Sequence, residues 1–141
     1  MRNFRNLKIW INAMQITTNV YLLVRKLPYE ERFDLSSQLR RSSVSIPSNI
    51  AEGSSRTSAK ERAHYVEVAI GSAFELETQL LIAKNIGYLT EQEVEIQIME
   101  LSELQKSMNR YNEVIRNDSV RKNLTLCAFS LALIILILLC Q

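Results

Sequence analysis

The sequence has few of the residues on which catalytic and metal-binding sites depend. It contains one histidine, His64, and two cysteines, Cys127 and Cys140, which both lie near its C-terminal end. Because the rest of the chain has no cysteine, it can form neither a disulfide framework nor a thiolate zinc site, and a reducing, cytoplasmic setting fits this usage. One histidine cannot supply the paired Glu-x-x-His motifs of di-metal bundles, and a lone histidine on a helix is more often a surface residue than a general base. We therefore expect no enzyme activity, no metal site and no cofactor.

Glycine and proline are also scarce, with three and two residues in a chain of 141. Both residues interrupt helices, so their scarcity predicts a handful of long helices joined by short turns. A chain of this length holds one domain with one core. The N-terminal sequence MRNFRNLKIW has no apolar run followed by small residues, so it does not resemble a signal peptide.

The net charge of +2 hides an uneven distribution of charge along the chain. Residues 1–66 carry eleven lysines and arginines against five acidic residues, whereas residues 67–141 carry six against ten. This asymmetry suits a chain that binds an acidic partner, or one whose basic and acidic parts meet in neighbouring copies. Ordinary solvated helix faces are the alternative interpretation.

Apolar residues recur at steps of three and four in four stretches, which is the period of an amphipathic helix. We expect helices over residues 7–27, 30–51, 59–86 and 91–117. Four such helices with short connections form an all-α, antiparallel up-down-up-down four-helix bundle. We assign residues 1–118 to this bundle and residues 119–141 to an apolar C-terminal tail.

Turn and capping residues set the boundaries of these helices. Proline stops a helix and glycine closes one, whereas Ser or Thr followed three residues later by Glu forms a capping box at a helix start. The predicted stops are Pro28, Gly53 and Gly87, and the predicted starts are Glu30, Ser58–Glu61 and Thr90–Glu93.

The apolar stripe of each helix identifies candidate core residues. Trp10 is expected to anchor the core or an interface. Phe74, with Ile70 and Leu81, widens the apolar surface of the third helix and indicates a second packing face. Gly71 costs that helix about 1 kcal/mol relative to alanine unless close packing compensates. The stripes are Leu7, Trp10, Met14, Thr17, Tyr21 and Val24, with Ala13, Val20 and Leu27 beside them; Leu35, Leu39, Ser42, Ser43, Ile46 and Ile50; Val66, Ala69, Ala73, Leu76, Leu80 and Ala83; and Val94, Ile98, Leu101, Gln105, Met108 and Ile115, with Leu104 and Tyr111 alongside.

The segment 38–58, QLRRSSVSIPSNIAEGSSRTS, combines adjacent arginines, a proline within a helical pattern and several small residues. Pro47 removes a backbone donor, and because the apolar spacing resumes at Ile50 we expect a kink there rather than a helix end. The serines are small enough to let another helix approach closely. We therefore expect this segment to organise the packing of the bundle.

Five basic residues in or just after this segment form a candidate site, namely Arg40, Arg41, Arg56, Lys60 and Arg62. Guanidinium groups suit contacts with the phosphates of a nucleic acid. The alternative is that Arg40 and Arg41 form ion pairs with Glu52, Glu75 or Glu77, inside the bundle or across a subunit interface. The absence of interleaved aromatic residues and the low net charge fit this alternative.

Three segments of the sequence resemble a known family. They are FRNLKIW at residues 4–10, QLRRSSVSIPSNIAEGSSRTSAKE at residues 38–61 and AIGSAFELETQLLIAKNIGYL at residues 69–89. They resemble the bacterial four-helix-bundle proteins encoded in intervening sequences of 23S ribosomal RNA genes, and the likeness covers about residues 3–115. The same fold family includes the accessory variability protein of diversity-generating retroelements.

This resemblance implies a left-handed four-helix bundle that assembles as a homopentameric barrel. The intervening-sequence branch has no established activity, whereas the retroelement branch is similar to a basic barrel that binds nucleic acid and a reverse transcriptase. This chain departs from the retroelement branch because it is close to neutral. The shared block implies fold or interface roles for most of Arg40, Arg41, Asn49, Glu52, Gly53 and Arg56.

The tail is a second departure from the family pattern. Its segment 124–140, LTLCAFSLALIILILLC, has seventeen residues without a charge. As a helix it would span about 25 Å, against about 30 Å for the hydrocarbon core of a bilayer. Arg116, Arg121 and Lys122 would keep the bundle on the cytoplasmic side. A membrane anchor is our leading interpretation, and a helix buried in an oligomer or a read-through extension are the alternatives.

Together these patterns predict a non-enzymatic, homo-oligomeric scaffold that binds another macromolecule. Its structural or interface residues are expected to be Trp10, Pro47, Asn49, Glu52, Gly53, Gly71, Glu75 and Glu77. The second hypothesis is a nucleic-acid-binding accessory protein with a basic patch, which predicts binding that weakens steeply with salt.

Overall fold

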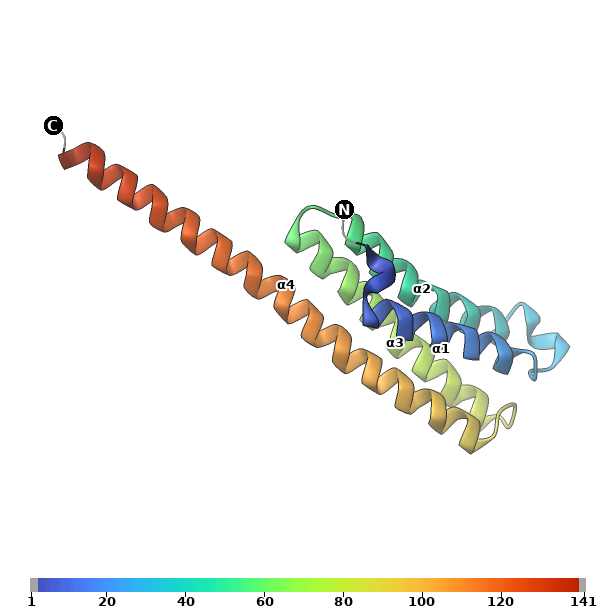
Figure 1. The fold of residues 1–141 in the computed structure, drawn as a ribbon. Helices are drawn as coiled ribbons and strands as arrows, with labels where there is room; N and C mark the ends of the chain where they lie inside the picture. Colours follow the sequence, from blue (N-terminus) through green and yellow to red (C-terminus); the bar gives the residue numbers. More distant parts are fainter. Residues whose placement is uncertain (1–2, 140–141) are drawn as a thin grey trace.

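A computed structural model describes the backbone of residues 3–139 and the side chains of residues 3–118 and Val120. Its elements are η1 (Phe4–Asn6), α1 (Lys8–Val24), η2 (Tyr29–Arg32), α2 (Leu35–Ser55), α3 (Ala59–Asn85) and α4 (Glu91–Leu139). The four α-helices alternate in direction and pack antiparallel (Figure 1). The predicted all-α four-helix bundle is confirmed.

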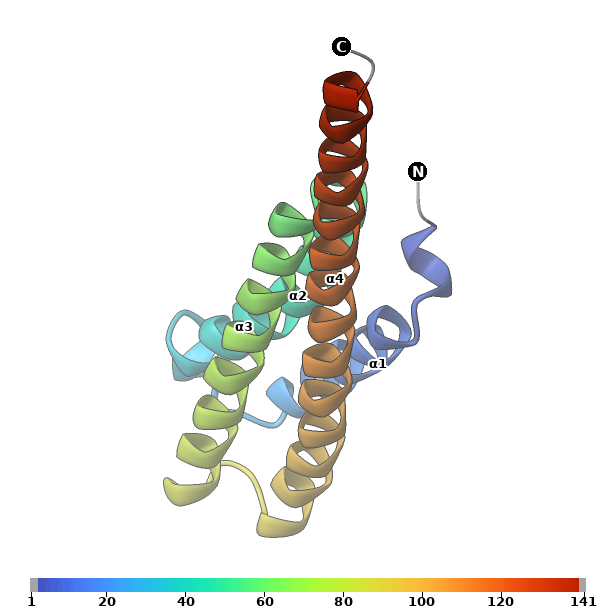
Figure 2. The ribbon, with the colours of Figure 1, turned by 90° about the vertical axis from the view of Figure 1, so that its left-hand side faces the viewer.

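The helices follow one another around the bundle. α2 packs against α1 and α3, and α4 packs against α3 and α1. The N-terminus and the α2–α3 connection lie at one end of the bundle, and the α1–α2 and α3–α4 connections lie at the other (Figure 1). α4 continues well past the first end, as a second view also shows (Figure 2).

The predicted core stripes of α2, α3 and α4 are confirmed, with Leu35 and Ile98 half-buried, whereas the stripe of α1 is correct only in part. Val24 and the flanking Ala13, Val20 and Leu27 are buried as predicted. The buried residues of α1 are Ile9, Ala13, Ile16, Val20 and Val24. Met14 and Tyr21, predicted to be core residues, are 41% and 44% exposed. The helix carries apolar residues on nearly every side, so its period alone could not identify the buried side.

The ends of α3 and α4 follow the predicted capping chemistry. Thr90 and Glu93 form a reciprocal capping box, in which the Glu93 amide donates to Thr90 Oγ1 at 3.3 Å and the Thr90 amide donates to Glu93 Oε2 at 2.9 Å. Gly87 has a φ of 82°, and the Tyr88 amide donates to the Ala83 carbonyl at 2.9 Å. This hydrogen bond is the signature of a Schellman C-cap.

The start of α2 lies later in the chain than predicted. Glu30 belongs to η2, a single turn of 3-10 helix, and α2 begins at Leu35. Glu31 explains how α2 is capped, because its Oε2 accepts a hydrogen bond from the Leu35 amide at 3.2 Å. Its Oε1 accepts from the hydroxyl of Tyr88 at 3.0 Å, which ties this turn to the α3–α4 connection.

The segment rich in serine forms most of α2, and two of its predicted features have different outcomes. The helix continues through Pro47, as expected, and the kink there stays a prediction. Gly53 does not close the helix, which runs on to Ser55. Instead, a Cβ at Gly53 would lie 2.9 Å from the Cβ of Tyr65. Glycine therefore permits a close approach of α2 to α3.

The fourth helix does not end near Asn117, because α4 runs without interruption from Glu91 to Leu139. It crosses the predicted domain boundary after residue 118, and so the predicted C-terminal helix is a continuation of the fourth helix. In the part of the chain whose side chains are described, no helix is long and apolar enough to cross a membrane. The segment 124–140 lies outside those residues, so its role as an anchor stays a prediction.

Candidate interaction surfaces

The five basic candidate residues do not form one patch. Arg40 and Arg41 lie in the first half of α2, whereas Arg56, Lys60 and Arg62 surround the connection between α2 and α3. Arg56 lies fifteen positions after Arg41, just past the end of α2, which corresponds to about 22 Å along the helix axis. The structure therefore divides the predicted nucleic-acid site into two separate groups.

Two residues of the second group hold the α2–α3 connection together. Arg56 pairs with Glu52, and its Nη2 donates to the hydroxyl of Tyr65 at 3.0 Å. Burial acts to lower the pKa of Arg56, but Tyr65 and Glu52 outweigh it, so the pKa is raised. Arg62 donates to the carbonyls of Arg56 and Thr57, at 3.3 and 2.8 Å. These arginines therefore have a structural role, because their contacts hold the α2–α3 connection against α3.

Arg40 and Arg41 have a different environment. Arg41 is exposed, Arg40 is half-buried, and no acidic group among the described side chains lies within 4.0 Å of either guanidinium.

The predicted ion pairs of Arg40 and Arg41 within one subunit are therefore wrong. Their proposed partners make other contacts. Glu52 pairs with Arg56, Glu75 accepts from Gln79 at 3.1 Å, and Glu77 accepts from Gln105 at 3.0 Å. Pairing across a subunit interface remains open.

The remaining predicted structural residues have separate positions. Trp10 is half-buried and makes an edge contact with Phe4, at 5.2 Å between ring centroids. Trp10 and Pro47 both line a shallow groove between α1 and α2. Asn49 donates to the Ser45 carbonyl at 2.7 Å, within α2. Gly71 is exposed, and a Cβ there would meet no atom within 4 Å. Close packing within one subunit therefore does not explain Gly71.

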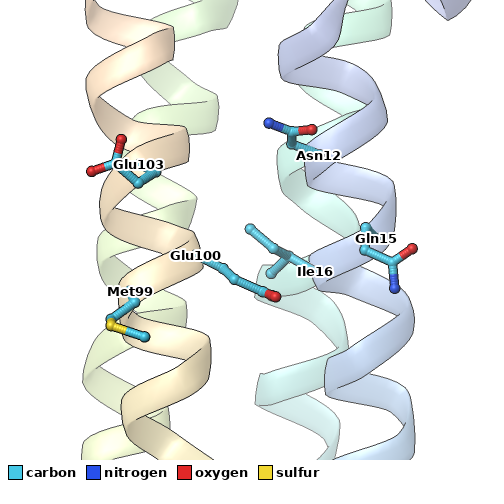
Figure 3. Close-up of a pocket in the computed structure, with 6 residues that line it drawn as sticks. All are labelled: Asn12, Gln15, Ile16, Met99, Glu100 and Glu103. Carbon is cyan, nitrogen blue, oxygen red and sulfur yellow. The ribbon is translucent and has the colours of Figure 1, made fainter.

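A groove between α1 and α4 is the feature that the sequence patterns did not reveal. It has a volume of about 380 Å³ and is lined by Asn12, Gln15, Ile16, Met99, Glu100 and Glu103. The close-up shows Glu100 extending from α4 toward Ile16 of α1 (Figure 3). Amide and carboxylate groups here surround a small apolar floor. The groove therefore suits a partner that carries hydrogen-bond donors and positive charge.

Large apolar residues are exposed on the two helices that form this groove. They include Ile11 and Leu22 of α1, at 50% and 52%, and Ile96 and Met99 of α4, at 45% and 65%. One signal for this surface was present in the sequence, because the sixteen residues from Ile9 to Val24 contain no charge. A helix with a fully solvated outer side normally carries charges there.

Within the described part of the chain, no group of three His, Cys, Asp or Glu side chains could hold a metal ion. His64 is exposed on α3 beside Lys60 and Glu67, in a hollow that Arg116 of α4 also lines. Glu67 pairs with Arg116, which links α3 to α4.

Comparison with known proteins agrees with this fold. No curated protein matches the sequence. A crystal structure of a protein of unknown function from the S23 ribosomal protein family of Bacteroides thetaiotaomicron superposes with a TM-score of 0.69 and 23% identity. The alignment covers 74% of this chain and 97% of that one. At this identity the likeness shows the fold alone.

A family model assigns the chain to a protein family, which the structural likeness cannot do. The model for the 23S rRNA-intervening sequence protein matches residues 5–110, which is most of the bundle. The predicted resemblance rested on segments within nearly the same range. The chain therefore belongs to the 23S rRNA-intervening sequence protein family.

Proposed function

We propose that this chain is a non-enzymatic, homo-oligomeric scaffold whose task is to bind another macromolecule. The observation that carries the proposal is the uncharged stretch of α1, from Ile9 to Val24, because it leaves Ile11, Tyr21 and Leu22 exposed on a single subunit. Exposed apolar surface of this extent typically marks a protein–protein contact. Self-association would cover it without the need for a second protein.

The family resemblance supports a specific form of this assembly, a pentamer of left-handed bundles. The exposed Gly71 of α3 fits such an assembly, because a mid-helix glycine is unfavourable in water and favourable where another helix approaches closely. Phe74 is 54% exposed on the same helix and would lie in a second surface of contact between subunits.

The assembly can be tested with a fragment of residues 1–118. Every buried apolar side chain of the described part of the chain lies between Ile9 and Ile115, so this fragment retains the described core. Leu22→Glu should lower the solution mass measured by light scattering, because it places a charge on the apolar face. Asn85→Glu, at an exposed position of α3, is the matched control. Equal masses for both variants would contradict an interface on α1.

The alternative function is nucleic-acid binding by an accessory protein. Arg40 and Arg41 support it, because the structure describes no acidic partner for either within the subunit. A variant that removes one phosphate contact should show a weaker salt dependence of binding. Two results would exclude this role. One is binding of a mixed RNA pool that does not change with salt, and the other is binding that stays intact in Arg40→Gln and Arg41→Gln.

We also propose that the segment 124–140 attaches the bundle to a membrane on its cytoplasmic side. The continuity of α4 supports this, because the helix passes from the bundle into the uncharged segment without a break. The full chain should float with phospholipid vesicles, whereas residues 1–118 should not. Equal behaviour of the two would contradict the anchor.

A further inference from the structure

We infer that the groove between α1 and α4 receives the Arg40–Arg41 pair from α2 of a second copy. The inference rests on the proposed self-assembly and identifies the two surfaces through which neighbouring copies would make contact. One surface carries the carboxylates of Glu100 and Glu103, of which only Glu103 has a cationic partner among the described residues. The other carries Arg40 and Arg41, which have no acidic partner among those residues.

The groove offers acceptors at its rim. Glu100 uses one carboxylate oxygen to accept from Asn19 of α1, at 3.1 Å, and its other oxygen has no partner among the described residues. Gln15 donates to Asn19 at 3.0 Å, so a short chain of amides holds Glu100 in place. Glu103 pairs with Lys106 at 2.7 Å, but both side chains are more than half exposed. Such an exposed pair is weak enough to be exchanged.

The arginine pair offers the complementary chemistry. A guanidinium group donates two parallel hydrogen bonds to a carboxylate, a geometry that gives strength and direction. Val44 follows Arg41 by one helical turn and is 39% exposed, so it would bring an apolar side chain to the groove beside Met99. The paired surfaces therefore match in charge and in apolar content.

The charge asymmetry of the whole chain fits the same arrangement. Arg40 and Arg41 belong to the basic part, residues 1–66, and Glu100 and Glu103 belong to the acidic part, residues 67–141. Like charges would repel if the copies met through the same part of each chain. Contact between the two parts of different copies joins opposite charges.

The placement of the two surfaces also determines the symmetry. α2 packs against α1 and α3, and the described contacts do not include one with α4, so Arg41 and the groove lie on different sides of the bundle. A contact between two different surfaces is heterologous, and its repetition produces a ring when the rotation closes. The assembly would therefore be cyclic rather than a set of two-fold dimers.

The test exchanges the charges in the full chain. Arg41→Glu and Glu103→Arg should each raise the concentration at which half of the chains are assembled by about 10-fold or more, because each places like charges in contact. The double variant, R41E with E103R, should restore assembly. Glu95→Arg, an exposed acid of α4 outside the groove lining, is the matched control and should have little effect. Native mass spectrometry from a fixed non-ionic detergent measures the assembly, and circular dichroism checks the fold.

The outcomes separate this inference from the proposed function. A full chain that stays monomeric without any substitution would overturn the self-assembly itself. An oligomer that tolerates both single variants, or that the double variant fails to restore, would overturn only the pairing of these surfaces. Loss of RNA binding in Arg41→Glu with no change in mass would also overturn it and assign the arginines to phosphate contacts.

Discussion

The two helix pairs of the bundle, α2–α3 and α1–α4, solve the same packing problem in different ways. α2 and α3 meet through small polar residues. The hydroxyls of Ser45 and Ser72 lie 2.8 Å apart, and Ser42 donates to Gln79 at 2.7 Å in a buried position. At Gly53 the backbone of α2 lies against the side chain of Tyr65 of α3. Small side chains allow close approach, and short hydrogen bonds satisfy the polar groups that become buried.

α1 and α4 are joined by longer side chains. Lys26 pairs with Glu93 near one end, and Asn19 donates to Glu100 at 3.1 Å farther along. Beside the second contact, on the side away from Lys26, a groove of about 380 Å³ remains open. The comparison shows that the small residues of α2 and α3 close their side within one subunit, whereas the longer side chains of α1 and α4 leave a groove. The open side is the one that we assign to a neighbouring copy.

The largest expected effect concerns the closed side. Leu76 of α3 is fully buried, and Leu76→Ala should lower the free energy of unfolding by about 2–5 kcal/mol, because it leaves a cavity. Met99→Ala, on the open side and 65% exposed, should change it by less than about 0.5 kcal/mol in the monomeric state. Urea titration of both variants measures the difference. Similar values would show that the two sides are packed alike.

Two glycines provide the next test. Gly53→Ala should destabilise the protein by about 1–3 kcal/mol, because the added methyl group would lie 2.9 Å from the Cβ of Tyr65. Gly71→Ala should instead stabilise a single subunit by up to about 1 kcal/mol, because alanine is the better helix former. Thermal unfolding of both variants at low concentration checks these signs. A stabilising Gly53→Ala would contradict the close approach of α2 to α3.

The two capping boxes are not equivalent, and this predicts a smaller difference. Thr90 and Glu93 exchange hydrogen bonds in both directions at the start of α4, whereas Ser58 only accepts from the Glu61 amide, at a long 3.5 Å. Thr90→Ala should therefore cost about 1 kcal/mol, and Ser58→Ala should cost less. Guanidinium chloride unfolding of the two variants would rank them. The reverse order would show that geometry at the cap does not control its strength.

The last expected effect is a dependence on pH at the α1–α4 side, where solvent around the 59% exposed Lys26 screens the ion pair and reduces its contribution to stability. The hydrogen bond from Lys26, and then those from Thr90, lower the pKa of Glu93 from 4.5 to about 2. Because the pKa is lowered in the folded state, the ionised carboxylate stabilises the fold above its ordinary pKa, and this stability is lost as pH falls toward about 2. Glu93→Gln keeps a capping side chain and should remove this part of the acid sensitivity. An unchanged pH profile of unfolding would contradict the assignment.

The sequence predicted the closed side of the bundle better than the open side. α2 carries one apolar stripe on an otherwise polar helix, and α3 carries a regular stripe beside further apolar residues such as Phe74, so the period identified buried residues such as Ile46 and Leu80. Lys8, at its start, is the only charged residue of α1, so no charge marks the solvent side along the rest of the helix, and the predicted stripe was centred beside the buried face. Gly53 lies near the end of α2 and was therefore predicted to cap it. Its contact with Tyr65 depends on tertiary packing, which a local sequence pattern does not contain.

Some errors could have been avoided from the sequence. The chain has no Gly or Pro after Gly87, which is the signal that α4 continues to Leu139 instead of ending near Asn117. Glu52 and Arg56 are four residues apart, the spacing of a helical ion pair, so their pairing was foreseeable. The groove between α1 and α4 was not, because it depends on how far two helices distant in the sequence stand from each other.

The most direct test of this account is the solution mass of residues 1–118, measured by light scattering over a range of concentration at low and high salt. We expect a mass several times that of one chain, with five copies as the specific prediction, and no dependence on added RNA or DNA. The mass of one chain at every concentration would contradict the account. A particle that forms only with nucleic acid at low salt would replace the scaffold with a nucleic-acid-binding protein.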